Sequence, residues 1–195
     1  MSLTAIFGGT FNPIHKGHYE MIKALNASDR VSKILIMPAK MPPHKSADFL
    51  ASDEDRLNMC KIVADDFKKA TVLDIEFKRE GKSYTYDTVK ILKDIYKDDQ
   101  LAFVCGGDML VYFDKWYKYE ELMKMLPFIV FSRTSTNADE FSSCAERFEK
   151  MGMQIILMND NIPNVSSTNF RDDKTSSLLP QKVYDYIKER GLYGV

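Results

Sequence analysis

Cysteine, histidine and tryptophan are scarce in this chain of 195 residues, which has three, three and one of them. Cys60, Cys105 and Cys144 are odd in number, lie far apart and include no C-x-x-C pair, which argues against a disulfide framework. We interpret them as reduced thiols of a cytoplasmic protein, two of them filling the core.

A strong net charge and a long apolar run are also missing. The net charge of −1 provides no basic field for nucleic acid or an anionic membrane, so any bound phosphate must be held by local groups. The start, "MSLTAIFGGTFNP", has no cationic segment, and its apolar run stops at Gly8-Gly9. No run approaches the length of a membrane span. We therefore expect a cytoplasmic protein with no membrane or nucleic-acid partner.

What is present is an alternation of apolar runs with helical patterns along the whole chain. Buried strands that alternate with helices predict a mainly parallel sheet covered on both faces, a Rossmann-like, doubly wound α/β fold. We expect one domain over residues 1–195. The expected strands are 3–8, 33–39, 71–77, 100–108, 127–133 and 153–159. The expected helices include 16–26, 53–68, 85–96 and one between Pro180 and Gly191.

Two glycine pairs, Gly8-Gly9 and Gly106-Gly107, stand at the ends of expected strands. Ligands of such folds bind beyond the carboxyl ends of the strands, so this edge is the expected site. Residues 133–141 and 171–179 are polar and are expected to be the most mobile loops.

The stretch "IFGGTFNPIHKGH" (6–18) places two of the three histidines beside a glycine turn. A metal site lacks further ligands nearby, since His44 is distant in sequence. A tight turn with two structural histidines is the plainer alternative. An anion site fits best, because a helix start offers free N–H groups, imidazoles donate to phosphate oxygens, and Gly17 lets a ligand approach.

The stretch "GTFNPIHKGH" resembles the H-x-G-H signature of the nucleotidyltransferase superfamily. Its second signature is present as "SSTNFR" (166–171), which alone would more often be a helix cap. The stretches "MPAKMPPHK", "GKSYTYDTV", "CGGDMLVYFDKWYKYEEL" and "LPQKVYDYIKERGLY" resemble the nicotinate-mononucleotide adenylyltransferase family over essentially the whole chain. The shorter phosphopantetheine enzymes lack them. One departure is Asn12, where many relatives carry Asp.

The resemblance implies transfer of the adenylyl group of ATP to nicotinate mononucleotide, in NAD biosynthesis. The acceptor phosphate is already charged, so the reaction needs positioning and charge neutralisation rather than a general base. By resemblance, His18 and His15 are catalytic, and a Mg²⁺ ion comes with ATP, with no protein metal ligand expected. The implied ATP-binding residues are Gly8, Gly9, Thr10, Phe11, His15, His18, Gly106, Asp108, Ser167, Thr168 and Arg171. A helix cap is the structural alternative for Asp108.

The nicotinate ring is cationic, and Trp116 in the matching "KWY" segment offers it an aromatic face. An ordinary packing role is the alternative for Trp116, as a solvated loop charge is for Lys45. The residues assigned to the acceptor by resemblance are His44, Lys45, Tyr84, Thr85, Met109, Trp116, Tyr117 and Arg133.

Other functions stay open at this point. They are the same chemistry on nicotinamide mononucleotide or phosphopantetheine, and a nucleotide sensor without turnover. A homodimer also stays open.

Overall fold

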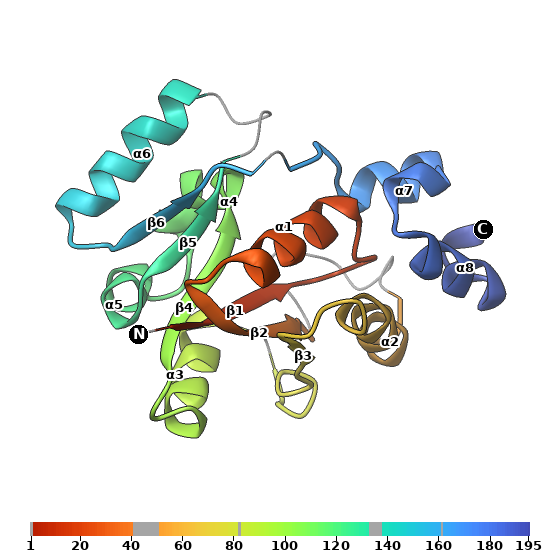
Figure 1. Ribbon diagram of the computed structural model, residues 1–195, viewed down its shortest axis with the longest axis horizontal. Helices are drawn as coiled ribbons and strands as arrows, with labels where there is room; N and C mark the ends of the chain where they lie inside the picture. Colours follow the sequence, from red (N-terminus) through yellow and green to blue (C-terminus); the bar gives the residue numbers. More distant parts are fainter. Residues whose placement is uncertain (1, 41–50, 82, 133–137, 161) are drawn as a thin grey trace.

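The computed structural model describes residues 2–40, 51–81, 83–132, 138–160 and 162–195. Its centre is a six-stranded parallel sheet in the order β3-β2-β1-β4-β5-β6 (Figure 1). The strands are Leu3–Gly9 (β1), Val31–Pro38 (β2), Ala70–Val72 (β3), Gln100–Gly106 (β4), Phe128–Phe131 (β5) and Ile155–Met158 (β6). The predicted Rossmann-like sheet is confirmed.

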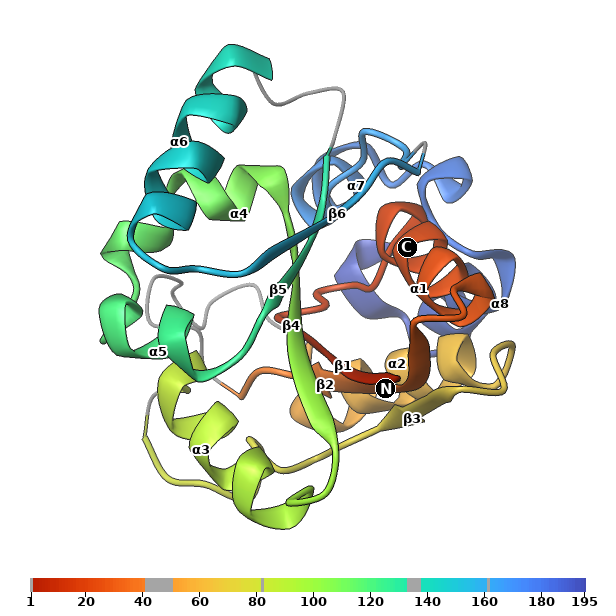
Figure 2. The ribbon, with the colours of Figure 1, turned by 60° about the vertical axis from the view of Figure 1, so that its left-hand side comes forward.

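Helices cover both faces of this sheet, with α1, α2, α7 and α8 on one side and α3 to α6 on the other (Figure 2). Their bounds are Lys16–Ala27 (α1), Asp53–Ala64 (α2), Thr85–Ile95 (α3), Gly107–Val111 (α4), Tyr119–Met125 (α5), Ala138–Lys150 (α6), Ser167–Asp173 (α7) and Gln181–Glu189 (α8). The C-terminal helix starts after Pro180 and ends before Gly191, as predicted.

The two faces carry separate hydrophobic clusters because successive strand residues point to opposite sides. In β4, Ala102 and Val104 join the cluster under α1, α2 and α8, whereas Phe103 and Cys105 join the cluster under α3 to α6. All four are buried. This alternation explains why the strands are apolar without interruption.

Several expected bounds differ from the structure. The strands predicted over 33–39, 127–133 and 153–159 span Val31–Pro38, Phe128–Phe131 and Ile155–Met158, the helix predicted over 53–68 ends at Ala64, and two further strands end early. The strand predicted over 71–77 ends at Val72, because the chain turns at Asp74, whose carbonyl accepts from Phe77 N at 3.0 Å and Lys78 N at 3.3 Å. The strand predicted over 100–108 ends at Gly106, where α4 begins.

The two predicted loops are corrected in part. Residues 138–141 open α6, whose first turn carries Asp139 and Glu140, and acidic residues stabilise a helix start. In 171–179, residues 171–173 belong to α7 and 176–178 form a short 3-10 turn. Both stretches are therefore partly helical among the described residues, and residues 133–137 lie outside the described part of the chain.

The order of the sheet reverses between β1 and β4, which are neighbours although the chain visits β2 and β3 in between. The ends of both strands therefore face the same crevice. Helices α7 and α8 lie beyond the carboxyl end of β1, beside the start of α1 and α2 (Figure 1). The expected site thus lies where the first and last thirds of the chain meet.

Candidate active site

The turn from β1 into α1 holds His15 and His18 as a reciprocal cap. His15 is the N-cap residue, its Nδ1 accepts from His18 N at 3.4 Å, and His18 Nδ1 accepts from His15 N at 3.2 Å. The two rings stack with centroids 3.6 Å apart. Because each Nδ1 accepts a hydrogen bond, each neutral ring carries its proton on Nε2 and presents it as a donor.

The aromatic residues of the same strand and turn support the His18 ring. Phe11 lies edge-on to His18 at 5.0 Å between centroids, and Phe7 does so at 5.8 Å. Phe11 is 1% exposed and has a positive φ of 47°. The Phe11 ring therefore has a packing role, and any contact of Phe11 with ATP would come from its main chain.

The glycines of this turn are required mainly by packing. A Cβ on Gly9 would lie 2.9 Å from the Phe11 ring. A Cβ on Gly17 would lie 3.0 Å from His15 Cε1 and 3.3 Å from the carbonyl of Pro163. A side chain at either position would displace the ring that shapes the turn.

The two signature motifs meet directly, although they lie at opposite ends of the chain. Arg171 Nη1 donates to the carbonyl of Asn12 at 2.7 Å across 159 positions of sequence, and Ser167 Oγ donates to the carbonyl of Pro13 at 2.9 Å. Arg171 Nη2 donates to Thr168 Oγ1 at 3.0 Å. The start of α7 is thus fixed against the turn that precedes α1.

Ser166 is the N-cap of α7, as the cap interpretation of "SSTNFR" predicted. Its Oγ accepts from Asn169 N at 3.1 Å, and Asn169 Oδ1 accepts from Ser166 N at 3.0 Å. The motif is therefore a helix cap as well as a neighbour of the histidine turn.

Arg56 of α2 hydrogen-bonds to the turn between β1 and α1, a role that was not predicted from the sequence. Its side chain is 0% exposed, and its Nη1 donates to the carbonyl of Thr10 at 2.8 Å. It also donates to the carbonyls of Ala39, Lys40 and Ala51 and pairs with Asp53. An arginine among other charged residues of a helix is usually exposed, so the sequence does not indicate that Arg56 is buried against main-chain carbonyls.

The end of β4 contributes Gly106 and the first turn of α4. Gly106 is the N-cap of α4, so the cap alternative for Asp108 was wrong, and Asp108 and Met109 are exposed in the first turn. Burial, with the charge of Asp108, raises the pKa of the Cys105 thiol to about 12. Cys105 is therefore a core residue, not a nucleophile.

The aromatic residues assigned to the acceptor gather on the other side of β4. Trp116 packs edge-on against Phe103, with centroids 5.8 Å apart, and at a tilt against Phe113, with centroids 5.4 Å apart. Tyr117 is exposed and lies 4.7 Å from the ring of Tyr84, next to Thr85 at the start of α3. Phe103 links this group to the glycine turn, since a Cβ on Gly8 would lie 3.6 Å from its ring.

Trp116 is half-buried, so the packing role expected as an alternative is present. His44, Lys45 and Arg133 lie outside the described residues. Within the described part, no group of three or more His, Cys, Asp and Glu side chains could hold a metal ion. No helix there is long and apolar enough to cross a membrane.

Residues 6–173 match the family model described as cytidylyltransferase-like. The chain is 34% identical over 200 residues to the nicotinate-nucleotide adenylyltransferase of Bacillus subtilis, with 99% of each chain covered. It is 35% identical over 191 residues to a Listeria monocytogenes protein named "Probable nicotinate-nucleotide adenylyltransferase", covering 97% of this chain and 96% of the relative.

Its fold is similar to that of Plasmodium falciparum nicotinic acid mononucleotide adenylyltransferase complexed with NaAD. The TM-score is 0.83 at 22% identity, with 99% of this chain and 98% of the other covered. The resemblance inferred from the motifs is confirmed by these matches. The chain belongs to the cytidylyltransferase-like family and, within it, to the nicotinate-nucleotide adenylyltransferases.

Proposed function

We propose that the protein transfers the adenylyl group of ATP to the 5′-phosphate of nicotinate mononucleotide, forming nicotinate adenine dinucleotide and pyrophosphate. The observation that carries this proposal is the meeting of the His15–His18 turn with Ser167 and Arg171 at the switch point of the sheet. The named relatives, which match over nearly their whole length, support the choice of reaction.

The chemistry asks for phosphate donors rather than for an acid–base pair. The acceptor phosphate is largely ionised at neutral pH, so its oxygen attacks the α-phosphorus without losing a proton to the protein. The P–O bond to the β-phosphate breaks, and pyrophosphate leaves in line with the attacking oxygen. The protein has to align the two phosphates and stabilise the charge on the transferred group.

His18 is proposed as the main donor to the transferred group, with His15 beside it. Both rings are held so that Nε2–H points away from the helix start that each Nδ1 caps. Ser167, Thr168 and Arg171 would approach the nucleotide from α7. Gly8, Gly9, Thr10 and Phe11 would lie along ATP through their main chain, with Gly106 and Asp108 on the ribose and adenine side.

The acceptor is proposed to bind on the side of Trp116, Tyr117, Tyr84, Thr85 and Met109. Aromatic faces suit a pyridinium ring, and exposed Tyr117 and Met109 are accessible to one. His44, Lys45 and Arg133 remain predictions for the phosphate contacts.

A Mg²⁺ ion is proposed to enter with ATP. The described residues around the turn supply hydrogen-bond donors, a set that fits an ion held by phosphate oxygens and water. When bound, the ion would neutralise charge on the triphosphate, and Arg171 and the two histidines would align the phosphates.

We also propose that residues 1–195 act as one nucleotidyltransferase domain in the cytoplasm. The three cysteines are unpaired, which suits a reducing compartment. A homodimer stays a prediction, to be measured by sedimentation.

The proposed function predicts pyrophosphate release from ATP with nicotinate mononucleotide as the preferred acceptor. The measurement is a coupled pyrophosphate assay with three acceptors offered separately: nicotinate mononucleotide, nicotinamide mononucleotide and phosphopantetheine. A higher kcat/KM with phosphopantetheine would contradict the proposed acceptor. Binding of ATP without pyrophosphate release for any acceptor would favour the nucleotide sensor instead.

A further inference from the structure

The last residues of the chain take an unusual backbone path beyond α8. Gly191, Tyr193 and Gly194 all have positive φ angles, of 60°, 56° and 74°. The left-handed region is ordinary for glycine but uncommon for tyrosine. A non-glycine residue keeps such a backbone conformation only where the surrounding contacts hold it, so the contacts of the Tyr193 side chain matter.

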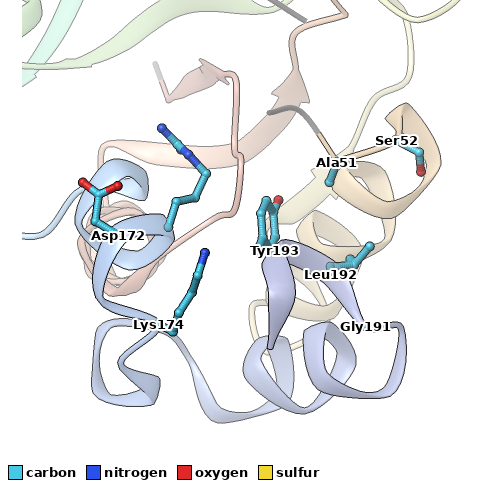
Figure 3. A pocket seen from close by; sticks show the side chains of 8 residues that line it. Ala51, Ser52, Asp172, Lys174, Gly191, Leu192 and Tyr193 are labelled. Atoms are coloured by element: carbon cyan, nitrogen blue, oxygen red, sulfur yellow. The ribbon is translucent and has the colours of Figure 1, made fainter. Parts of the chain in front are cut away.

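Tyr193 stands in the wall of an open cavity of about 680 Å³ between the C-terminal segment, the end of α7 and the start of α2. Figure 3 shows its ring between Lys174 on one side and Ala51 on the other. The ring also packs edge-on against Phe170 of α7, with centroids 5.9 Å apart. The side chain is thus directed inward, toward the turn that precedes α1.

The Tyr193 hydroxyl is hydrogen-bonded to the side chain of Asn12. It donates to Asn12 Oδ1 at 2.7 Å, and the N–H of Ala51 donates to the same oxygen at 3.0 Å. Asn12 is 4% exposed, so the acceptor that the two bonds share is buried. Burial raises the pKa of Tyr193 well above its usual value, which keeps the hydroxyl protonated and a donor.

The main chain at Asn12 and Pro13 is held by side chains of α7. The carbonyls of Asn12 and Pro13 accept from Arg171 and Ser167 at 2.7 and 2.9 Å. His15 follows two residues after Pro13. The side chain of Asn12 therefore links the turn to the C-terminal segment and to the start of α2. The main-chain carbonyls of the same turn accept hydrogen bonds from α7.

We propose that Tyr193 is a positioning residue for adenylyl transfer: through Asn12 it fixes the histidine turn relative to Arg171. Tyr193 lies 181 positions from Asn12 in sequence and contacts the turn through the side chain of Asn12, so the role we assign to it is to hold the turn in place. The bond needs only an acceptor at residue 12, which either an amide or a carboxylate oxygen provides. This inference rests on the proposed function.

The first test is Tyr193→Phe, which removes the hydroxyl and keeps the ring. We expect kcat to fall about tenfold, with KM for ATP and acceptor nearly unchanged, because misplacement of aligned groups costs rate rather than binding. Tyr184→Phe is the matched control: Tyr184 also packs edge-on against Phe170, and its hydroxyl makes no hydrogen bond within the described residues. That variant should keep the parent kcat. All rates are taken well below each variant's melting temperature and per folded enzyme.

The second test is a double-mutant cycle with Asn12. Asn12→Ala should lower kcat by at least as much as Tyr193→Phe, and the double variant should be no slower than Asn12→Ala alone. Asn12→Asp should stay within about threefold of the parent, because it keeps an acceptor for both donors. Additive losses would contradict the route through Asn12.

The outcomes separate the two proposals. A parent enzyme that releases no pyrophosphate contradicts the proposed function. An active parent whose Tyr193→Phe variant has the same kcat contradicts only the positioning role. A Tyr193→Phe variant that loses thermal stability but no rate per folded enzyme would show a structural residue, and would also overturn the inference.

Discussion

At the scale of single residues, the cap made by His18 and the catalytic role proposed for it involve different atoms of the ring. Its Nδ1 accepts from the backbone of His15 in the reciprocal cap of α1, and its Nε2–H is the proposed donor to phosphate. Helix α7 has the same reciprocal cap made from Ser166 and Asn169. The side-chain amide of Asn169 in α7 thus makes the same hydrogen bond to the N-cap backbone as the imidazole of His18 in α1, although the Asn side chain is shorter.

His18→Asn should therefore separate capping from catalysis. Asn can still accept from the His15 N–H, so we expect a melting temperature close to the parent, but kcat should fall about 100- to 1000-fold because the donor no longer reaches the transferred phosphate. His18→Ala should lose the same rate and in addition about 1 kcal/mol of stability. Steady-state kinetics and thermal unfolding measure both. Turnover at the parent rate in His18→Asn would remove His18 from the mechanism.

At the scale of elements, the sequence predicted strands well where the apolar run was long and both faces were covered. In β4, Ala102 and Val104 are buried on one face of the sheet and Phe103 and Cys105 on the other, so no polar position interrupts the apolar run. It failed at β3, because the turn at Asp74 that ends the strand early depends on main-chain hydrogen bonds. It also failed at 138–141, where acidic residues that open α6 resemble a solvated loop.

Arg56 fixes helix α2 to the neighbouring main chain, in addition to the apolar residues that α2 buries in the core. Arg56→Lys keeps the charge, but an ammonium has no planar fork with which to reach carbonyls in three segments. We expect the free energy of unfolding to fall by about 2–4 kcal/mol, since buried carbonyls lose their donors, and kcat to fall because Thr10 loses its anchor. Urea unfolding and the pyrophosphate assay measure the two effects.

The control for this variant is Arg147→Lys in α6. Arg147 is half-exposed and pairs with Asp114 at 3.0 Å, and surface pairs of this kind contribute about 1 kcal/mol or less. Equal losses for the two variants would contradict the role given to Arg56.

At the scale of the whole molecule, the site is closed by elements that are remote in sequence. The motifs around His18 and Ser167 could be predicted because helix starts and glycine turns are local signals. Arg56, Asn12 and Tyr193 could not, because their roles arise from contacts that only the fold creates. The sequence thus indicated which groups are proposed to bind phosphate, and the structure adds the residues that hold those groups in place.

The contacts of Asp55 in α2 with Tyr186 and Arg190 at α8 are expected to make the stability of the fold depend on pH. Asp55 of α2 accepts from Ser52 at 2.6 Å, from Tyr186 at 2.8 Å and from Arg190 at 3.3 Å. Burial alone would raise the pKa of Asp55, but these hydrogen bonds and the charge of Arg190 outweigh it and hold the pKa below its usual range. The carboxylate is therefore favoured in the folded protein.

A carboxyl group whose pKa is lower in the folded than in the unfolded state stabilises the fold above the unfolded pKa of about 4, and that contribution is lost as the pH falls through the folded pKa. Asp55→Asn should therefore unfold more easily than the parent at pH 7, by about 1–3 kcal/mol. The difference should shrink steadily below about pH 4. Urea unfolding at pH 7, 5, 4 and 3 measures it, with Asp65→Asn, an exposed position just after α2, as the control. A difference between Asp55→Asn and parent that is independent of pH would show that packing, not the carboxylate, fastens α8.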